Sequence, residues 1–317
     1  MYGKTLLLLL TACALWLTSA PASAVTFDWV TVGNPGNACD VQSEGCFGSV
    51  ADTYRISRHE VTNAQYAEFL NAKAASDTLD LYSPNMGSGF GGITRSGSPG
   101  SYTYSPIVGR ENMPVNYVTF FDSARFTNWL DNGQGSGDTE TGAYTLLGGT
   151  ALPSNGLELT RNAGATLFVP SEDEWYKAAY YDALTTSFFD NPAGSDTQPV
   201  CAAAGATPNT ANCGVVVGDL TAVGSYTGSA SPYGTFDQGG NVWEWNDSII
   251  PSFNRGLRGG AYNYGANNQA ASLRPSSGSM LEESFVGFRV ASIPEPGTGL
   301  LVLTGLLTLS GSRRRRV

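Results

Sequence analysis

The sequence predicts an α+β fold with little regular secondary structure. Three segments with helical spacing lie in the first part of the chain, and short strand-like segments between Gly-rich turns fill the last third. Strand and helix patterns do not alternate along the chain as a parallel βαβ sheet requires. Long irregular segments inside a compact domain usually carry function or hold an ion. We therefore expect one domain with separate helical and strand-rich parts.

The N-terminal elements are predicted from alternation and capping signals. Residues 25–32 alternate as a strand does, residues 33–48 are expected to form a loop, and residues 54–57 form a second strand. Thr62 is a good N-cap, and Gln65 completes a capping box that starts the first helix.

The central elements alternate between helices and long loops. The Gly-, Ser- and Tyr-rich residues 77–109 are expected to form a surface loop, followed by a helix at 120–130. Ser171 and Glu174 form a capping box for a third helix. Residues 185–218 are predicted to be another long loop.

The two ends of the chain are predicted to be sorting segments. Residues 1–24 combine a basic start, an apolar run from Leu6 to Leu17 and a small-residue cleavage site, as in a secretory signal peptide. Leu10–Cys13 also fits a lipoprotein signal, although the apolar run continues past it. We expect the mature chain to begin near Val25.

Residues 293–317 contain Pro-Glu-Pro at 294–296, an apolar segment from Gly297 to Ser310, and the cluster Arg313–Arg316. The apolar segment is shorter than the ~20 residues of a free-standing span, and the arginines favour the cytoplasmic side. This ordered triple resembles the PEP-CTERM sorting signal. The resemblance implies cleavage by an exosortase in the inner membrane of a Gram-negative bacterium, with delivery to the cell surface or extracellular matrix. An ordinary tail anchor is the alternative.

The domain between these ends, residues 25–292, is acidic. The whole chain has 17 Lys and Arg against 27 Asp and Glu, and its formal net charge of −10 already includes the tail arginines. Such a surface repels nucleic acid and anionic lipid and accommodates divalent cations. We therefore expect no nucleic-acid partner, and membrane contact only through the C-terminal segment before processing.

Four cysteines remain after Cys13 leaves with the signal, and an even number in an exported protein indicates disulfides. Three pairings are open. Cys39 with Cys46 and Cys201 with Cys213 are favoured, because each pair brackets a short polar loop. Four free thiols are the alternative.

The stretch from Gly239 to Trp245, with sequence Gly-Gly-Asn-Val-Trp-Glu-Trp, suggests a metal-binding turn. Asp237 and Glu244 flank it, so two carboxylates could converge with backbone carbonyls, a mixture that calcium prefers. The alternative is a glycine turn that leads into a strand with core tryptophans.

Six short motifs stand in order between residues 54 and 291. They are Glu60–Thr62, Met113–Val115, Val169–Trp175, Gly240–Trp245, Arg258–Gly260 and Gly287–Arg289. Together they resemble the formylglycine-generating enzyme family, also called the sulfatase-modifying factor domain. The resemblance implies an elaborated C-type-lectin-like fold with structural calcium. One implied site uses the side chains of Asp237 and Glu244 with the carbonyls of Gly240 and Val242; a second uses Asn212 and Asp219 with carbonyls near Cys213 and Thr221.

The enzymatic members of that family oxidise a substrate cysteine with O₂, using copper held by two cysteines after the Arg-Gly-Gly strand. Soft thiolates suit Cu(I). In this chain no cysteine follows Cys213, and the matching positions are about Tyr264 and Gln269. Ala261 replaces a family serine. Copper is therefore not expected, and we assign no catalytic residue.

Other chemistries are equally poor matches. The sulfoxide-forming branch of the superfamily uses iron held by several histidines, whereas this chain has only His59, expected at the surface. The carboxylate pairs Glu172/Glu174 and Glu282/Glu283 are expected on solvated faces rather than as glycosidase acids.

Polar and aromatic residues fill the segment where the copper ligands would stand. Such residues combine rigid contact area with adaptable hydrogen bonds, and ligand-binding members of the lectin-like superfamily use this same segment. We expect binding of a glycan or protein at the surface or in an exopolysaccharide matrix. An oxidase with an unlocated site, a structural matrix protein and a plain surface loop remain open. The candidate residues are Tyr262, Asn263, Tyr264, Asn267, Asn268 and Gln269.

Overall fold

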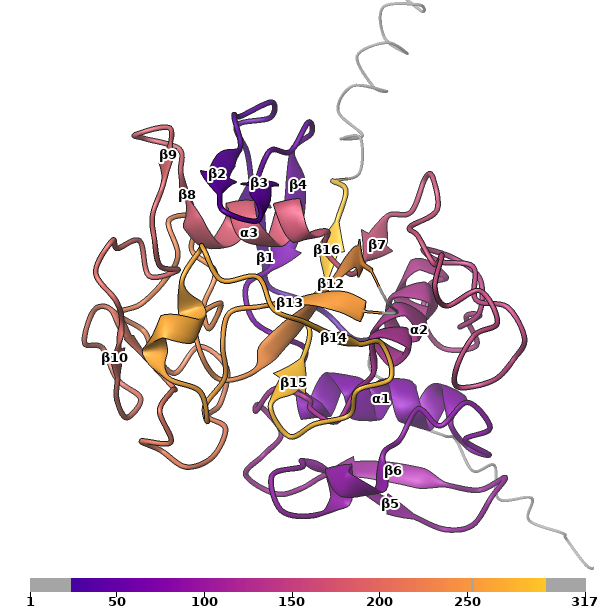
Figure 1. The fold of residues 1–317 in the computed structure, drawn as a ribbon. Helices are drawn as coiled ribbons and strands as arrows, with labels where there is room; N and C mark the ends of the chain where they lie inside the picture. The colour runs from indigo at the N-terminus through magenta and orange to yellow at the C-terminus, as the bar shows by residue number, and fades with distance from the viewer. Residues whose placement is uncertain (1–23, 252–253, 295–317) are drawn as a thin grey trace, which may run out of the picture.

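The computed structural model describes residues 24–251 and 254–294, and its strands form two small sheets with helices packed around them (Figure 1). The first sheet has the order β1-β4-β16-β7, all antiparallel, so the two ends of the domain lie in one sheet. Its strands are β1 (Trp29–Val32), β4 (Tyr54–Ser57), β7 (Leu167–Phe168) and β16 (Ala291–Ser292).

The second sheet has the order β14-β13-β12-β15, with β12 and β15 parallel and the other pairs antiparallel. The longest strand, β12, carries the Trp-Glu-Trp sequence and is irregular between Trp245 and Ile249, where its register with β13 shifts. The strands are β12 (Trp243–Ile250), β13 (Asn254–Arg258), β14 (Ser276–Gly278) and β15 (Val286–Gly287).

Short two-stranded pairs and single helical turns make up the remaining regular structure, as the α+β prediction of few regular elements requires. The pairs are β2 (Asp40–Gln42) with β3 (Gly45–Phe47), β5 (Ile93–Ser96) with β6 (Thr103–Pro106), β8 (Tyr181–Asp182) with β9 (Ser187–Phe188), and β10 (Val200–Cys201) with β11 (Thr210–Ala211). The single turns are η1 (Pro84–Gly87) and η2 (Ala266–Gln269).

The three α-helices of the described residues all begin with a capping box: α1 (Asn63–Lys73), α2 (Phe120–Asp131) and α3 (Glu172–Tyr180). In each, the N-cap side chain accepts from the backbone three residues on, and that residue's side chain accepts from the N-cap backbone. The predicted boxes at Thr62 and Ser171 are confirmed. None of the helices in the described part of the chain is long and apolar enough to cross a bilayer.

An aromatic cluster joins α1 and α2 to the C-terminal part of the chain. The ring of Phe126 lies 5.4 Å from Phe69 and 5.4 Å from Phe288, both edge-on, and the ring of Tyr66 stacks on it at 5.8 Å. All four side chains are buried. Edge-to-face pairs add stability beyond the area they bury, so this cluster fixes the helices against the sheets.

Residues 77–109 are not the surface loop that the sequence predicts. They form η1 and the β5–β6 hairpin, and Leu81, Tyr82 and Met86 are buried. The side-chain amide of Asn71 on α1 exchanges two hydrogen bonds with the backbone of Tyr104, which ties the hairpin to the helix. The apolar residues of this segment are spaced irregularly among Gly and Ser, so no strand period is visible.

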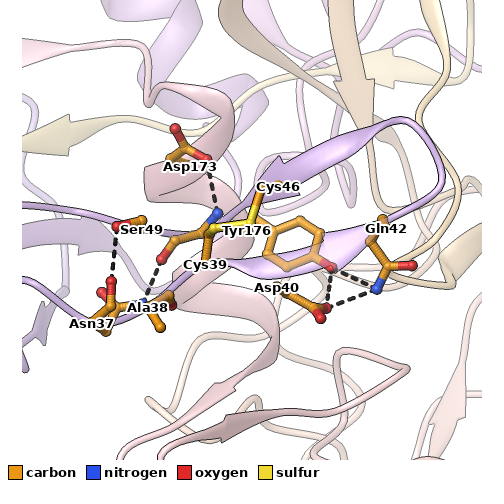
Figure 2. Close-up of a disulfide and its surroundings, with 10 residues drawn as sticks. Asn37, Ala38, Cys39, Asp40, Gln42, Cys46, Ser49, Asp173 and Tyr176 are labelled. Carbon is orange, nitrogen blue, oxygen red and sulfur yellow. Dashed lines mark hydrogen bonds between the residues drawn. A yellow bond between two sulfur atoms is a disulfide. The ribbon is translucent and has the colours of Figure 1, made fainter.

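Both predicted disulfides are confirmed. Cys39–Cys46 closes the β2–β3 hairpin inside the segment predicted as a loop, and Figure 2 shows it beside α3. There the Asp173 carboxylate accepts from the Gly48 amide at 2.8 Å, and the Tyr176 hydroxyl donates to Asp40 at 2.6 Å. Cys201–Cys213 joins β10 to the residues after β11.

Buried carboxyls give the fold a pH dependence. Burial raises the pKa of Asp122, the capping residue of α2, to about 7, and burial raises the pKa of Asp247 to about 6. The native protein thus keeps protons that an unfolded chain, with Asp near 3.9, has released. This contribution to stability is complete below about pH 4 and is lost as the pH rises through about 6 to 7.

We therefore expect the free energy of unfolding to fall between about pH 5 and pH 8, by at most about 1.4 kcal/mol for each unit of pKa difference. Urea unfolding at both pH values measures it. Asp122→Asn, which keeps an acceptor for Thr119, should flatten part of the slope. The lowered pKa of His59 acts in the opposite direction below about pH 6.5, so the test is the difference in slope between the parent and Asp122→Asn. Equal slopes would contradict the assignment.

Candidate functional site

The turn before β12 is held in left-handed backbone conformations. Asp237, Gly240 and Asn241 have φ angles of 58°, 87° and 61°. A Cβ on Gly240 would lie 2.4 Å from the carbonyl oxygen of Asn212, so only glycine fits there. The turn therefore brings the residue-212 loop directly against the start of β12.

Glu244 lies wholly buried in β12 with its carboxylate already engaged. Arg289 donates to both of its oxygens, at 2.5 and 2.6 Å, and the indole N–H of Trp175 donates to Oε2 at 2.6 Å. One lone pair on Oε1 is left for another partner. The alternative of a glycine turn leading into a strand with core tryptophans describes this stretch correctly, and calcium at Glu244 stays a prediction.

Asn241 is the centre of a buried polar network. Its Nδ2 donates to Oε1 of Glu60 at 3.1 Å, and its Oδ1 accepts from Asn212 Nδ2 at 3.2 Å and from the Thr221 amide at 3.0 Å. This network joins Asn212 and Thr221 of the second predicted calcium set to Glu60 through one side chain. It also explains why a left-handed Asn stands between Gly240 and Val242.

Two carboxyls, Glu60 in this network and Asp237 beside it, have raised pKa values. Burial, and then the charges of Asp237 and Glu244, raise the pKa of Glu60 well above its usual range, and its Oε2 has no hydrogen-bond partner within the described residues. Asp237 accepts from the Gly224 amide at 2.5 Å, and burial raises its pKa to about 6. A cation or protons must balance these charges.

The second predicted calcium set offers one open oxygen. Oδ1 of Asn212 is buried without a partner in the part of the chain that the structure describes. Asp219, in contrast, forms a two-bond ion pair with Arg110 at 2.7 and 3.0 Å. The carbonyls of Cys213 and Thr221 each accept a hydrogen bond already.

Across the described ranges, no three His, Cys, Asp or Glu side chains are placed to hold a metal. The remaining member of the first set, Val242, is buried against Leu220 and Tyr262. Calcium at either place would therefore need carbonyl or amide oxygens in addition to the carboxylates of its set, and calcium accepts such oxygens.

The six candidate ligand-binding residues do not form one surface. Tyr262 is only 4% exposed and its ring packs against Phe90, so it belongs to the core. Tyr264 is 36% exposed and lies edge-on between Trp243 and Phe285. The segment therefore has one buried and one partly exposed tyrosine, a difference that the sequence does not reveal.

The residues that follow Tyr264 lie on or beside η2, and they differ in exposure. Asn263 and Asn267 are exposed, Asn268 is half-exposed and bonds to the Gly265 carbonyl, and Gln269 is buried. Gly214 donates to the Tyr264 carbonyl at 2.7 Å, so the Cys201–Cys213 loop supports this segment. Figure 1 shows η2, in orange, on the side of the molecule that carries β10.

Two cavities border η2. The first has a volume of about 10 Å³, room for one water molecule, and Asp237, Gly239 and Gln269 are among its lining residues. Nε2 of Gln269 is buried without a partner in the described structure. A Cβ on Gly239 would lie 2.5 Å from the Gln269 side chain, so the glycine makes room for it.

The second cavity is open and has a volume of about 400 Å³. Its lining is almost entirely polar and combines carboxylates, amides and a hydroxyl. Only Asn267 of this lining was predicted; the others come from the residue-190 loop and the residues after η2, whose sequences show no motif. The lining residues are Asp190, Asn191, Asp196, Gln198, Asn267, Ala270 and Ser272.

The Glu172/Glu174 pair is not on a solvated face, which corrects the expectation from sequence. Glu172 is buried and binds Arg258 at 2.7 Å and Arg274 at 2.8 Å. Glu174 is buried and pairs with Arg161. The arginines that bind Glu172 come from distant parts of the chain, so local sequence could not show the pairing.

His59 is half-buried rather than a surface residue. Its ring stacks on Phe236 at 5.7 Å, and burial, followed by the charge of Arg289, lowers its pKa to about 4. It is the single histidine of the chain. The packing of the ring therefore accounts for its neutral state.

The sequence of the chain is similar to those of known proteins. Residues 48–293 match the family model described as the sulfatase-modifying factor enzyme 1-like domain. The chain is 28% identical over 211 residues to hercynine oxygenase of Mycolicibacterium smegmatis, a match that covers 62% of this chain and 38% of that protein. The chain thus spans well under half the length of this curated relative.

Two solved structures share the fold. CarF matches with a TM-score of 0.59 at 20% identity, over 86% of this chain and all of that one. Variable protein 1 of Treponema denticola matches with a TM-score of 0.54 at 20% identity, over 87% of this chain and 98% of that one. The predicted α+β fold of the formylglycine-generating enzyme type is confirmed.

Proposed function

Because this chain belongs to the family of sulfatase-modifying factor enzyme 1-like domains, we propose that it keeps the family fold and uses it to bind a polar ligand, such as a glycan, beside η2. The observation that carries the proposal is the open cavity of about 400 Å³ against this segment. Ligand pockets commonly have volumes of this order.

The chemistry of the lining favours a hydroxyl-rich ligand. Asp190 and Asp196 supply carboxylate acceptors, and Asn191, Gln198 and Asn267 supply amides that both donate and accept. Sugar hydroxyls also donate and accept, so each can pair with such groups. Tyr264 adds a partly exposed ring nearby on the same segment.

The residues where the copper ligands would stand give no support for thiolate oxidation. Those positions hold Tyr264 and Gln269, and the four described cysteines are all in disulfides. A thiolate is the ligand that Cu(I) selects. The segment is therefore better suited to binding than to copper chemistry.

A glycan array with the purified protein tests the binding proposal. We expect Asp196→Ala and Asn267→Ala to weaken binding of any captured glycan by about tenfold or more, since each removes hydrogen bonds to a buried hydroxyl. Asn263→Ala is the matched control, because Asn263 is exposed on the same segment and lines neither cavity. No captured glycan, or equal loss in the control, would refute the proposal and favour a structural role.

We also propose that calcium stabilises the domain through Asn212 and its neighbouring carbonyls. The unpartnered Asn212 oxygen and the acidic network around Asn241 support this. Saturating calcium at about 100 times its Kd would add about 2.7 kcal/mol. We expect a higher Tm in calcium than in chelator, and Asp219→Asn should reduce the difference; superimposable melts would exclude calcium.

Export and sorting complete the proposal. The signal-like residues 1–24 and the Pro-Glu-Pro tail at 293–317 lie largely outside the described residues, and the two disulfides suit an oxidising compartment. Mass spectrometry of the exported protein should find a start near Val25 and a chain cleaved in the tail by an exosortase. An intact tail in the surface fraction would contradict sorting of this kind.

The similarity to hercynine oxygenase favours oxygenase or cysteine oxidase activity as a second candidate function, and this activity can be tested directly. If the chain were an oxygenase or cysteine oxidase, it would consume O₂ in the presence of added copper or iron and a thiol substrate. We expect no consumption above that of the free metal. Turnover that Gln269→Ala abolishes would replace the binding proposal.

A further inference from the structure

A separate cavity of about 380 Å³ lies between the start of α2, the segment before η1 and the residue-280 turn. It shares no lining residue with the cavities beside η2. Three of its lining side chains are carboxylic acids and none is basic. The lining residues are Asp80, Tyr82, Ser83, Pro84, Thr119, Asp122, Ala151, Met280 and Glu282.

The three acids of this cavity have no ion-pair partner in the described structure. Asp80, Asp122 and Glu282 are absent from all nine described ion pairs. The positive charges nearby are already engaged. Arg125, one turn along α2, is bound to Glu140 at 2.6 Å, and Arg95 is bound to Asp77 at 3.0 Å.

Two of these acids, Asp122 and Glu282, have raised pKa values. Burial, followed by the charges of Asp80 and Asp77, raises the pKa of Glu282. The carboxyl of Asp122 is buried, and only its Oδ2 accepts hydrogen bonds, both from Thr119. A positive group in the cavity would relieve the repulsion and the desolvation of these carboxylates.

An independent observation indicates a missing polar partner. Ser83 lines the cavity and is only 3% exposed, yet its hydroxyl forms no hydrogen bond within the described residues. It lies near Glu282, and its hydroxyl lowers the pKa of that carboxyl. Buried hydroxyls are rarely left unpaired, so Ser83 has an acceptor or donor to gain from a ligand.

The size and lining of the cavity distinguish an organic cation from a metal ion. A bare divalent ion needs several oxygens within about 2.6 Å, and no such set of acidic side chains converges among the described residues. The volume suits a molecule of several heavy atoms instead. Tyr82 and Met280 provide apolar walls for its body, and Met adapts readily to different shapes.

We propose that this cavity binds a small organic cation, with a protonated amine placed between Asp122 and Glu282 and its carbon chain against Tyr82 and Met280. The Ser83 hydroxyl accepts from the ammonium group or bonds to a polar tail. This site is independent of the ligand proposed beside η2.

Isothermal titration with cadaverine tests the site, and 1,5-pentanediol is the uncharged control of the same length. We expect cadaverine to bind and the diol to give no signal. Glu282→Gln should weaken cadaverine binding by about tenfold or more, because a charge-assisted hydrogen bond is lost. Glu283→Gln should leave it unchanged, since Glu283 does not line the cavity.

Three outcomes would overturn the proposal. The first is the absence of cadaverine binding. The second is equal weakening by Glu283→Gln, which would indicate a general attraction to an acidic surface. The third is a Glu282-dependent Mn²⁺ signal without any amine binding. Thermal melts of both variants establish that the fold is intact. Asp122→Asn serves as a second variant, expected to weaken binding while its amide oxygen still caps α2.

Discussion

Replacing Arg289 with methionine is expected to destabilise the domain by about 3–5 kcal/mol, because it leaves the Glu244 carboxylate charged and uncompensated in the core. Neither side chain of this ion pair has any exposed area. Arg289 also donates to the carbonyls of Ser57 and Phe236, so its loss leaves these acceptors, as well as the buried carboxylate, without their donor. The midpoint of urea unfolding measures the effect.

The double variant Arg289→Met/Glu244→Gln separates charge from packing. The amide introduced by Glu244→Gln keeps an acceptor oxygen for the Trp175 indole while carrying no charge. We expect the double variant to be more stable than the Arg289→Met single variant, because the isolated charge has been removed. If the single variant unfolds at the same urea concentration as the parent, the buried ion pair does not contribute to stability as proposed.

Gly240→Ala is expected to cost about 3 kcal/mol or more. The new Cβ would lie 2.4 Å from the carbonyl oxygen of Asn212 and 3.1 Å from its carbonyl carbon, and backbone atoms cannot rotate away. The φ of +87° adds strain for any residue with a Cβ. Because the Asn212 loop also carries the predicted calcium oxygen, calcium should stabilise this variant less than the parent.

Gly205→Ala is the matched control, because a Cβ there meets no atom within 4 Å and its φ is not left-handed. It should change the Tm by less than about 2 °C, since a surface substitution is usually within about 0.5 kcal/mol. Equal Tm values for the two alanine variants would show that the close approach of Gly240 to Asn212 does not constrain the turn.

Local chemistry made the helices predictable. Thr62 with Gln65, and Ser171 with Glu174, satisfy the free backbone groups at a helix start with residues three positions apart. The two disulfides were equally accessible, because each joins cysteines only 7 or 12 residues apart in sequence. Such features depend on residues that are close together in the sequence, so they can be predicted from the sequence.

Secondary structure and burial were predicted poorly for segments without a hydrophobic period. Residues 77–109 look like a polar loop, yet their scattered apolar residues fill the space between α1 and the β5–β6 hairpin. Glu172 looks like a solvated acid, yet Arg258 and Arg274 reach it across 86 and 102 residues of sequence. Burial of this kind is set by partners from elsewhere in the chain.

The candidate sites likewise combine residues that the sequence identified with residues that it did not. The sequence identified the segment from Tyr262 to Gln269, but its partners Asp190 and Asp196 carry no motif and became apparent only as walls of a shared cavity. The sequence singled out Glu282 only as part of a carboxylate pair, and it did not predict the acidic cavity near Asp122 and Glu282, because the walls of this cavity come from separate parts of the chain.

By itself the sequence indicated the fold family, three helices with the caps of two of them, and the lack of thiols at Tyr264 and Gln269, and it favoured the observed disulfide pairs among three possible pairings. Each of these follows from residue identity at short spacing. Only the tertiary structure decided that Glu244 is bound to Arg289, that Asn212 keeps an open oxygen, and that two polar cavities exist. Charge pairing and cavity shape depend on distances between segments far apart in the chain, and these distances are fixed only when the whole core packs.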